Sequence, residues 1–353
     1  MTAAARFPLA KDDIRGEVAL VTGGSRGLGL LLARELARHS CPLIICARDA
    51  AELERAAGDL RADGADVTTV ACDLTDEASP RRLVDTAIER YGRLDIVISN
   101  AGVIQVGPEE ATEATHYETA VNTMALAPAR LALAALPVMR RQGHGRIVNI
   151  TSLGGKISVP HLLPYCTAKF AAVGFSEGLR AALGRRPVTV TTVVPGLMRT
   201  GSHMQALFTG QAEKEFTWFG LGASLPLVSM DAERAAHQII EAMRRRRAEI
   251  ILTPAAQVVA RVAQIAPGLT SEALHLVQRL ALPSPGGQRG RLTPGGALDP
   301  AISKSAFDRL TAAGRTAARR FNQRSEVSRR QQGAQPLTRP SRDDRASGAS
   351  AEA

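Results

Sequence analysis

Aromatic residues and cysteines are both rare in this chain of 353 residues. Trp, Tyr and Phe together make up 3% of the sequence. A protein that stacks many bases on aromatic side chains is therefore not indicated. The cysteines show no metal-ligand spacing, so we predict no metal site and expect buried, reduced thiols, as is usual in the cytosol. They are Cys41, Cys46, Cys72 and Cys166.

Long apolar runs are also missing. No stretch of 18 or more apolar residues is present, and the first 16 residues contain no apolar core of the kind found in signal peptides. We therefore expect neither a membrane span nor secretion, and we predict a cytoplasmic protein.

Positive charge is unevenly distributed along the chain. The formal net charge is +10. From Pro283 onward, 13 Lys/Arg stand against 6 Asp/Glu, which leaves about +3 for residues 1–282. This tail is rich in Pro, Gly, Ser, Arg and Gln, so we predict disorder over 283–353, with weak helical character over 303–321. A basic tail can also bind an anionic membrane or nucleic acid, but no recognisable nucleic-acid module accompanies this one.

The rest of the chain alternates strand-like runs with helical patterns. This alternation predicts an α/β fold with a parallel sheet of about seven strands and helices on both faces. In such folds a ligand binds beyond the carboxyl ends of the strands. The predicted strands are 17–22, 43–47, 67–72, 94–99, 146–151, 188–194 and 249–252.

A glycine-rich loop follows the first of these runs. The pattern Thr-Gly-x-x-x-Gly-x-Gly places glycines at Gly23, Gly27 and Gly29, and an apolar helical pattern follows over 30–36. Glycines let the backbone approach a pyrophosphate, while the helix N-terminus supplies free N–H groups and a positive dipole end. Because both flanks fit, we interpret the loop as a dinucleotide site rather than a flexible turn.

The residue after the second strand bears on the choice of cofactor. NAD-binding proteins carry an acid about 20 residues beyond the loop, where it binds the ribose hydroxyls. This chain has Ala47 and then Arg48 there, and Arg26 lies inside the glycine loop. Arginines pair with a 2′-phosphate that an acid would repel. The sequence therefore favours NADP(H), although either arginine alone also fits a solvated surface charge.

Tyr165 and Lys169 lie four residues apart and so share one face of a helix. A free tyrosine has a pKa of about 10, and a nearby ammonium lowers that pKa and makes the phenol a usable general acid or base. Ser152 follows the strand-like run 146–151 upstream of the pair. The pair alone fits an exposed helix face, but behind a dinucleotide loop it indicates proton transfer.

These motifs together resemble the short-chain dehydrogenase/reductase family, in its Tyr-x-x-x-Lys branch, over about residues 15–253. The resemblance implies a Rossmann-type, doubly wound sheet. It also implies an acid beside the adenine, an Asn-Ala-Gly turn beside the adenosine ribose, and a Pro-Gly segment that holds the nicotinamide carboxamide. The implied cofactor-binding residues are Gly23, Ser25, Arg26, Gly27, Leu28, Gly29, Arg48, Asp73, Leu74, Asn100, Ala101, Gly102, Tyr165, Lys169, Pro195, Gly196 and Thr200.

The resemblance implies four catalytic residues. Tyr165 exchanges a proton with the substrate oxygen, and Ser152 hydrogen-bonds that oxygen where charge develops. Lys169 holds the nicotinamide ribose and lowers the pKa of Tyr165. Asn122 positions a water that links Lys169 to solvent. The helix carrying Tyr165 and Lys169 is rich in Ala and Gly, and in this family it commonly packs against its copy, so we expect a homodimer or homotetramer.

Residues 201–230 interrupt the alternation and hold many of the large apolar side chains. By resemblance they form the substrate lid, which suggests an apolar ketone or alcohol substrate. The alternative is that these side chains only pack the lid onto the body. They include Met204, Phe208, Phe216, Trp218, Phe219, Leu221, Leu225 and Leu227.

Two further helices, 254–266 and 271–282, are predicted beyond the last strand, with Thr270 as an N-cap. Each carries an apolar stripe. We expect them to pack over the active site or a subunit edge, with peripheral membrane docking as the alternative, because a basic tail follows. The predicted domains are 1–253 for the NADP-binding unit, 254–282 for the helical extension and 283–353 for the tail.

The sequence leads to one favoured function and two alternatives. We expect an NADP(H)-dependent oxidoreductase that interconverts a carbonyl and a secondary alcohol on a lipophilic small molecule. A 3-oxoacyl thioester reductase of fatty-acid or polyketide type is an alternative within the enzyme class. An NADP-binding regulatory or scaffold protein is the alternative outside it, and the intact set of catalytic side chains argues against it.

Overall fold

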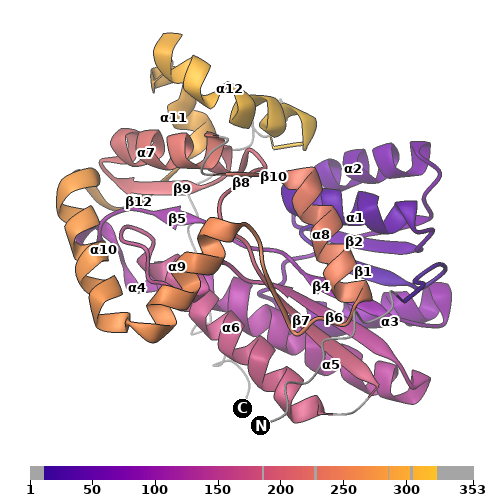
Figure 1. Cartoon of the computed structure of the whole chain (residues 1–353). Helices are drawn as coiled ribbons and strands as arrows, with labels where there is room; N and C mark the ends of the chain where they lie inside the picture. The colour runs from indigo at the N-terminus through magenta and orange to yellow at the C-terminus, as the bar shows by residue number, and fades with distance from the viewer. Residues whose placement is uncertain (1–11, 185–186, 226–228, 285, 303–304, 324–353) are drawn as a thin grey trace, which may run out of the picture.

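The computed structural model describes residues 12–184, 187–225, 229–284, 286–302 and 305–323. A parallel sheet of seven strands lies at its centre, in the order β11-β7-β6-β4-β1-β2-β3 (Figure 1). The predicted α/β architecture is confirmed, and each predicted strand overlaps a strand of this sheet. The strands are β1 (Ala19–Thr22), β2 (Leu43–Ala47), β3 (Val67–Ala71), β4 (Ile96–Ser99), β6 (Gly145–Ile150), β7 (Val188–Val194) and β11 (Glu249–Ile251).

Helices cover both faces of the sheet, so its central strands are apolar on both sides. In β1, for example, Val21 packs with the helices of one face and Leu20 with those of the other. The first face is covered by α1 (Gly27–Arg38), α2 (Ala50–Ala62) and α8 (Ala232–Arg244). The second is covered by α3 (Ser79–Tyr91), α5 (Ala127–Gln142) and α6 (Leu163–Leu183), with α4 (Ala114–Val121) packed against α6.

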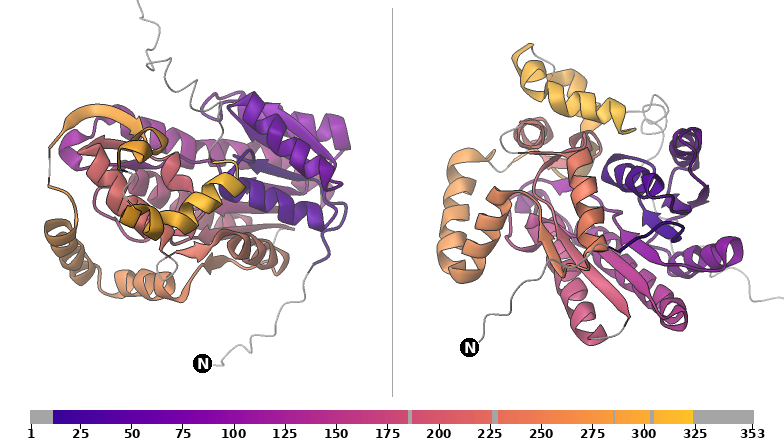
Figure 2. Two further views of the ribbon diagram at one scale, coloured as in Figure 1. Left: turned by 90° about the horizontal axis from the view of Figure 1, so that it is seen from above. Right: turned by 45° about the vertical axis from the view of Figure 1, so that its right-hand side comes forward.

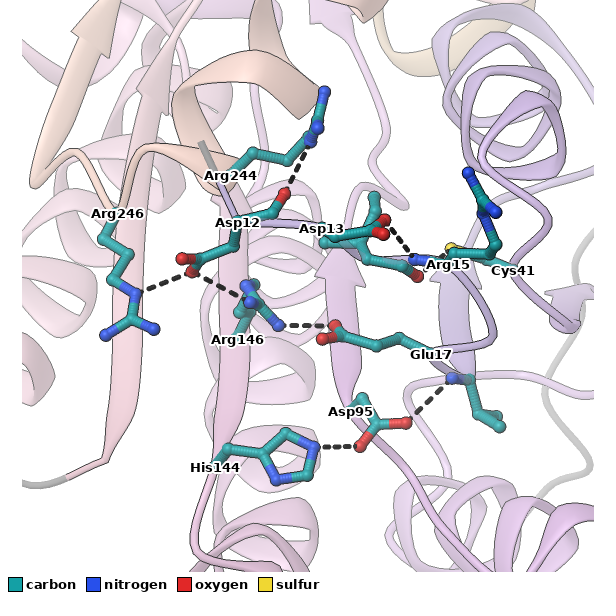
Figure 3. Close-up of polar contacts among 12 residues, drawn as sticks. Asp12, Asp13, Arg15, Glu17, Cys41, Asp95, His144, Arg146, Arg244 and Arg246 are labelled. Atoms are coloured by element: carbon teal, nitrogen blue, oxygen red, sulfur yellow. Dashed lines mark hydrogen bonds and ion pairs between the residues drawn. The ribbon is translucent and has the colours of Figure 1, made fainter. Parts of the chain in front are cut away.

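A polar network closes the amino ends of the central strands (Figure 3). Arg146, at the start of β6, donates to Asp12 at 2.9 Å and also pairs with Glu17. Asp95, just before β4, pairs with His144 at 2.7 Å. These contacts tie the residues before β1 to the sheet. They lie at the end opposite to the carboxyl ends of the strands, so we assign them to stability.

A second, three-stranded sheet forms the base of the predicted lid, and α7 (Ala212–Ser224) packs on it. The side chains of Phe208 and Phe216 are completely buried there. Its strands are β5 (Gln105–Val106), β9 (Leu207–Gly210) and β12 (Gln288–Pro294). The short elements nearby are η1 (Glu109–Ala111), β8 (Met198–Arg199), η4 (Ser202–Met204) and β10 (Met230–Asp231).

The two predicted helices of the extension are present as α9 (Pro254–Ile265) and α10 (Pro267–Ala281), at one edge of the molecule (Figures 1 and 2). The prediction of Thr270 as N-cap is wrong, because α10 begins at Pro267 with Ala266 as its N-cap. A proline fits the first helical turn, where its missing N–H costs nothing. The Thr270 hydroxyl instead donates back to the Ala266 carbonyl at 3.0 Å.

The tail is more ordered than predicted. After β12 come α11 (Gly295–Ile302) and α12 (Ser305–Arg320), both packed on α7 (Figure 1). The prediction of disorder is wrong here because β12 gains the backbone hydrogen bonds of β9, and α12 buries small residues such as Ala318. Residues 324–353 of the predicted disordered tail lie outside the described residues.

One helical stretch of the described chain, Ala114–Gln142, is long and apolar enough to cross a membrane by length and composition alone. Within it, α5 contributes Leu131, Ala135 and Leu136 to the core beneath the sheet. The core helix of a folded domain has the same composition, so this stretch is weak evidence for a span.

Candidate active site

The glycine loop turns sharply between β1 and α1, as predicted. Gly23 and Gly27 have φ of 66° and 55°, in the left-handed region that favours glycine. A Cβ on Gly29 would lie 2.0 Å from the carbonyl oxygen of Gly23, so α1 can start this close to the strand only with glycine there. The N-terminus of α1 therefore points its first N–H groups into the loop, a suitable arrangement for a pyrophosphate.

The Asn-Ala-Gly turn after β4 is fastened to the same loop. The Asn100 side chain donates to the Thr22 carbonyl at 2.9 Å, and its backbone N–H donates to the Thr22 hydroxyl at 2.9 Å. Ala101 N–H donates to the same hydroxyl at 3.1 Å. Thr22 thus fixes the relative position of two segments that are both predicted to contact the adenosine half of a dinucleotide.

Ser152 and the catalytic helix α6 meet through a short 3₁₀ turn, η3 (Leu153–Gly155). The Ser152 hydroxyl caps this turn by accepting from Gly154 N–H at 3.0 Å. A Cβ on Gly154 would lie 3.1 Å from the Tyr165 ring, and one on Gly155 would lie 2.6 Å from the Lys169 carbonyl oxygen. Two small residues thus let the turn pack tightly on α6 and bring Ser152 beside Tyr165.

Lys169 is buried and points along the end of β6. Its Nζ donates to the Ile150 carbonyl at 2.8 Å and lies 5.8 Å from the centre of the Tyr165 ring. Burial lowers the pKa of Lys169 to about 8, because the charged form is poorly solvated. The ammonium has three donors, so two remain for other acceptors such as ribose hydroxyls.

The pKa of Tyr165 differs from the expectation. Burial raises it to about 12, and the hydrogen bond with Ser152 only partly offsets this effect. The prediction that Lys169 lowers this pKa is therefore wrong for the structure without a bound dinucleotide. The physical reason is the same burial, which disfavours both the phenolate and the ammonium that would stabilise it.

Asn122 opens a five-residue π-helical segment, η2 (Asn122–Leu126), between α4 and α5. The Asn122 carbonyl accepts from Ala127 N–H, five residues ahead. Such segments often occur at functional sites. The segment packs against α6 and places Met124 near Gly102. The role of Asn122 in holding a water beside Lys169 stays a prediction.

The two arginines proposed for the 2′-phosphate have different surroundings. Arg48 is exposed and makes no ion pair with any residue of the described ranges. Arg26 pairs at 2.9 Å with Glu52, a buried acid that also accepts from the Ser25 hydroxyl at 2.5 Å. The sequence prediction missed Glu52, which sits in the first turn of α2 beneath the N-cap Asp49 and looks like an ordinary helix-start acid.

The remaining predicted residues also lie around the carboxyl ends of the strands. Exposed Asp73 follows β3 and accepts from the N–H and hydroxyl of Thr75 at 2.9 and 2.8 Å. The Pro195 carbonyl after β7 accepts from Leu153 N–H at 2.7 Å, which joins the Pro-Gly segment to the catalytic turn. Leu74 and Ala101 line one shared crevice. Leu28, Gly196 and Thr200 complete the set at the start of α1 and after β7.

A buried polar pair that the sequence did not predict links the lid to the catalytic segment. His161, four residues before Tyr165, hydrogen-bonds Glu215 of α7 at 2.8 Å. Glu215 also accepts from Trp218 Nε1 at 2.7 Å, and Gln278 of α10 lies 3.2 Å from His161 Nε2. Both His161 and Glu215 are buried, so the contact holds α7 beside the N-terminal end of α6.

Comparison with known proteins agrees with this geometry. Residues 17–209 match the family model described as short chain dehydrogenase. The chain is 37% identical over 188 residues to the granaticin polyketide synthase putative ketoacyl reductase 1 of Streptomyces violaceoruber, covering 52% of this chain and 68% of that protein. It is 34% identical over 198 residues to mouse estradiol 17-beta-dehydrogenase 11, covering 55% and 66%.

A solved structure gives the same result for the fold. A short chain dehydrogenase/reductase from Burkholderia phymatum, in complex with NAD, superposes with a TM-score of 0.66 at 25% identity. The match covers 73% of this chain and 96% of that one. The family model alone spans more than half of the chain. This protein therefore belongs to the short-chain dehydrogenase family.

Proposed function

We propose that the protein is an NADP(H)-dependent oxidoreductase that interconverts a carbonyl and a secondary alcohol on an apolar small molecule. The observation that carries the proposal is the packing of η3 on α6, which places Ser152, Tyr165 and Lys169 together beyond the carboxyl end of β6. A site of this kind needs a proton donor, a hydrogen bond to the reacting oxygen and a held nicotinamide. When bound, the nicotinamide exchanges hydride with the substrate carbon.

Each catalytic side chain has one task in this proposal. In reduction, Tyr165 gives its proton to the substrate oxygen, and its raised pKa keeps that proton available in the free protein. Ser152 donates to the same oxygen as negative charge develops on it. Lys169 binds the ribose hydroxyls with the two donors that are not used by the Ile150 carbonyl. Its positive charge favours the phenolate that Tyr165 becomes after it gives up its proton.

Two observations support the preference for NADP(H). Arg48 is exposed, unpaired among the described residues and directly follows β2, where an acid would select NAD. Glu52 holds Arg26 by an ion pair beside the glycine loop, so the guanidinium is oriented in advance but partly neutralised. Arg48 is therefore the stronger determinant of the two.

The apolar substrate is supported by the wall beside the catalytic tyrosine. Tyr165 packs against a cluster that contains Met204, Phe208 and Phe219 of the lid. These side chains are buried against one another, so they also hold the lid on the body of the protein. This agrees with the alternative that they only pack the lid. A lid built this way presents few polar groups to a substrate, whatever part of it lines the site.

The experiment is a turnover assay with NADPH, followed by absorbance, over a panel of hydrophobic ketones. Tyr165→Phe should abolish turnover while NADPH still binds, and Tyr117→Phe on α4 is the matched control that should remain active. If the intact chain binds NADPH but reduces nothing in the panel, the result would favour the alternative of an NADP-binding regulatory or scaffold protein. Reduction of 3-oxoacyl thioesters in preference to free ketones would favour the reductase alternative suggested by the name of the Streptomyces relative.

We also propose that α9 and α10 dock on an anionic membrane surface. No residue of α10 is buried, and Ile265 and Leu280 are 84% and 77% exposed. The bases Arg261 and Arg279 outnumber the single acid of the pair, Glu272. An apolar helix surface with basic side chains beside it fits the interface of an anionic bilayer.

Cosedimentation with vesicles tests this docking. The full chain should sediment with phosphatidylserine-containing vesicles more than with pure phosphatidylcholine, and the variant Ile265→Asp/Leu280→Asp should stay in solution. Leu310→Asp, which changes an exposed leucine of α12, is the control that keeps binding. Failure of the unmodified chain to sediment with either vesicle would contradict the proposal.

A further inference from the structure

The chain continues beyond α12 directly onto the glycine loop, and this contact is absent from the family pattern used above. The Phe321 carbonyl accepts from Gly27 N–H at 2.8 Å, and the Asn322 side chain donates to the Ser25 carbonyl at 2.9 Å. Figures 1 and 2 show α12 crossing from above α7 toward α1 and α8. The C-terminal segment thus bridges the lid and the dinucleotide loop.

The side chain of Gln323 fills the open face of Gly27. Its Nε2 lies 2.4 Å from the position that a Cβ on Gly27 would occupy, and the residue is only 6% exposed. Its amide oxygen has no hydrogen-bond partner among the described residues. Its carbonyl accepts from Gln205 Nε2 at 2.8 Å, so the backbone is held on the lid side as well.

This face of Gly27 is where a dinucleotide needs room. The second glycine of such loops lacks a side chain so that the backbone can approach the pyrophosphate. The first N–H of α1 is one of the donors that an anion would take. In the structure, the Phe321 carbonyl oxygen accepts the hydrogen bond from Gly27 N–H, and the Gln323 amide fills the space beside Gly27. A peptide carbonyl, with its partial negative charge, stands in for a phosphate oxygen.

We propose that residues 321–323, called the plug below, are a tethered competitor of the dinucleotide pyrophosphate, so that the protein must release them before the cofactor binds. The proposal rests on the proposed function, because it requires a dinucleotide to bind at this loop. The regulated step is cofactor entry, and the regulating element is the end of the C-terminal extension.

Packing around the plug explains how it is held and how it can leave. Phe321 is buried in the core cluster of α1 and α8, and a Cβ on Gly201 would lie 2.4 Å from the Cα of Ala318. The exposed ion pair from Arg320 to Glu233 of α8 adds a contact at 2.8 Å. By contrast, Asn322 has a φ of 58°, and Gln323 buries an unpartnered oxygen. Within the plug, the Phe321 side chain is therefore a well-packed anchor, while Asn322 and Gln323 are held less favourably.

A tethered competitor lowers the apparent affinity in proportion to the fraction of molecules in the open state. If the plug is closed in 90 to 99% of molecules, removing it should tighten dinucleotide binding by about 10–100-fold. The same change should lower KM for the dinucleotide and leave kcat nearly unchanged, because the contacts of the plug are with Gly27, Ser25 and Gln205 and not with Ser152, Tyr165 or Lys169.

The experiment compares two shortened chains with the full chain by fluorescence titration with NADPH. One ends at Arg320 and lacks the plug; the matched control ends at Val327 and keeps it. We expect tighter binding for the first and unchanged binding for the second. The full-length variant Asn322→Gly/Gln323→Gly checks the result without a new chain end near the loop and keeps the buried Phe321. Melting without ligand confirms that it folds.

The other outcomes overturn the proposal in different ways. Weaker NADPH binding after removal of the plug would mean that the plug covers and holds the bound cofactor. Unchanged binding would mean that release of the plug costs no free energy. If tightening occurs in the chain ending at Val327 as well, the effect belongs to residues after the plug. If no chain binds NADPH or NADH, the proposed function fails and the plug has nothing to compete with.

Discussion

Residues 17–252 and residues 254–323 differ in how far their apolar side chains are buried. In the first region, strands such as β1 and β4 are buried on both faces by helices. In the second, only Ala256 and Ala260 of α9 are buried, and α10 contains no buried residue. The far end of the extension is packed again, but against the lid and the glycine loop. The first region thus surrounds the proposed catalytic groups with a packed core, while α9 and α10 of the second leave large apolar side chains exposed.

The largest expected effect is on turnover and concerns Lys169, in residues 17–252. Lys169→Met should reduce kcat/KM by about 10²–10⁴-fold, the range of a general acid–base system that loses a required part. Because the ammonium is also predicted to hold the ribose, NADPH binding should weaken in parallel, as measured by fluorescence titration. The control is Lys214→Met, which changes an exposed lysine of α7 and should leave both quantities nearly unchanged. Loss of turnover with full affinity would contradict the ribose role.

The second prediction concerns the tight approach of α1 to β1. Gly29→Ala places a methyl group 2.0 Å from the Gly23 carbonyl oxygen and should lower the free energy of unfolding by about 3 kcal/mol or more. Gly58→Ala in α2 is the matched control, since nothing lies within 4 Å of its Cβ. That change should stabilise the protein by roughly 0.5–1 kcal/mol. Equal effects in urea unfolding would show that the loop relaxes around the methyl group.

The third prediction concerns the cofactor. Under the proposed function, Arg48→Asp would remove a charge-assisted hydrogen bond to the 2′-phosphate, a contact of about 1.5–3 kcal/mol, and add an acceptor for ribose hydroxyls. The ratio of NADPH to NADH affinity should fall by about 10–100-fold. Arg55→Asp, an exposed charge reversal on α2, controls for long-range electrostatics. If both variants lower the ratio equally, Arg48 makes no specific contact.

The lowered pKa of Lys169 gives a pH dependence of intermediate size. Below about pH 8 the amine is an ammonium, and above that value it loses its charge. NADPH affinity of the free protein should therefore fall by up to about tenfold as the pH rises through 8, and Lys169→Met should remove this part of the dependence. For folding the sign is reversed: a lysine with a lowered pKa adds stability as the pH rises from about 8 toward its unfolded value. A profile that is identical in both proteins would contradict the assignment.

Short motifs carried most of what could be predicted about the first region. Apolar runs of strand length placed all strands of the main sheet, because alternating strands and helices leave few topologies. The glycine loop, the Asn-Ala-Gly turn and the serine each follow a strand, and the carboxyl ends of parallel strands meet at one edge. Their convergence follows from the topology, so sequence order was enough to assemble the site.

Features that depend on packing between distant segments could not be predicted in this way. Glu52 resembles any acid in a first helical turn, and only the fold brings it to Ser25 and Arg26. The raised pKa of Tyr165 reflects burial, which no local spacing reports. The segment after Pro283 has the composition of a disordered chain, yet β12 pairs with β9 and Phe321 reaches the core. In each case the missing information was the identity of the neighbour.

The smallest expected effect sharpens the contrast between the two regions. Ile265→Gln in α9 should change the free energy of unfolding by less than about 0.5 kcal/mol, because the side chain is 84% exposed and loses no burial. Ile239→Val in α8, at a completely buried position, should cost about 0.5–1.5 kcal/mol although it removes only one methylene. Both are measured by urea unfolding at several protein concentrations, so that any contribution from association is detected. A loss above about 1 kcal/mol for Ile265→Gln would mean that α9 is covered in solution, and the contrast would then reflect a missing partner.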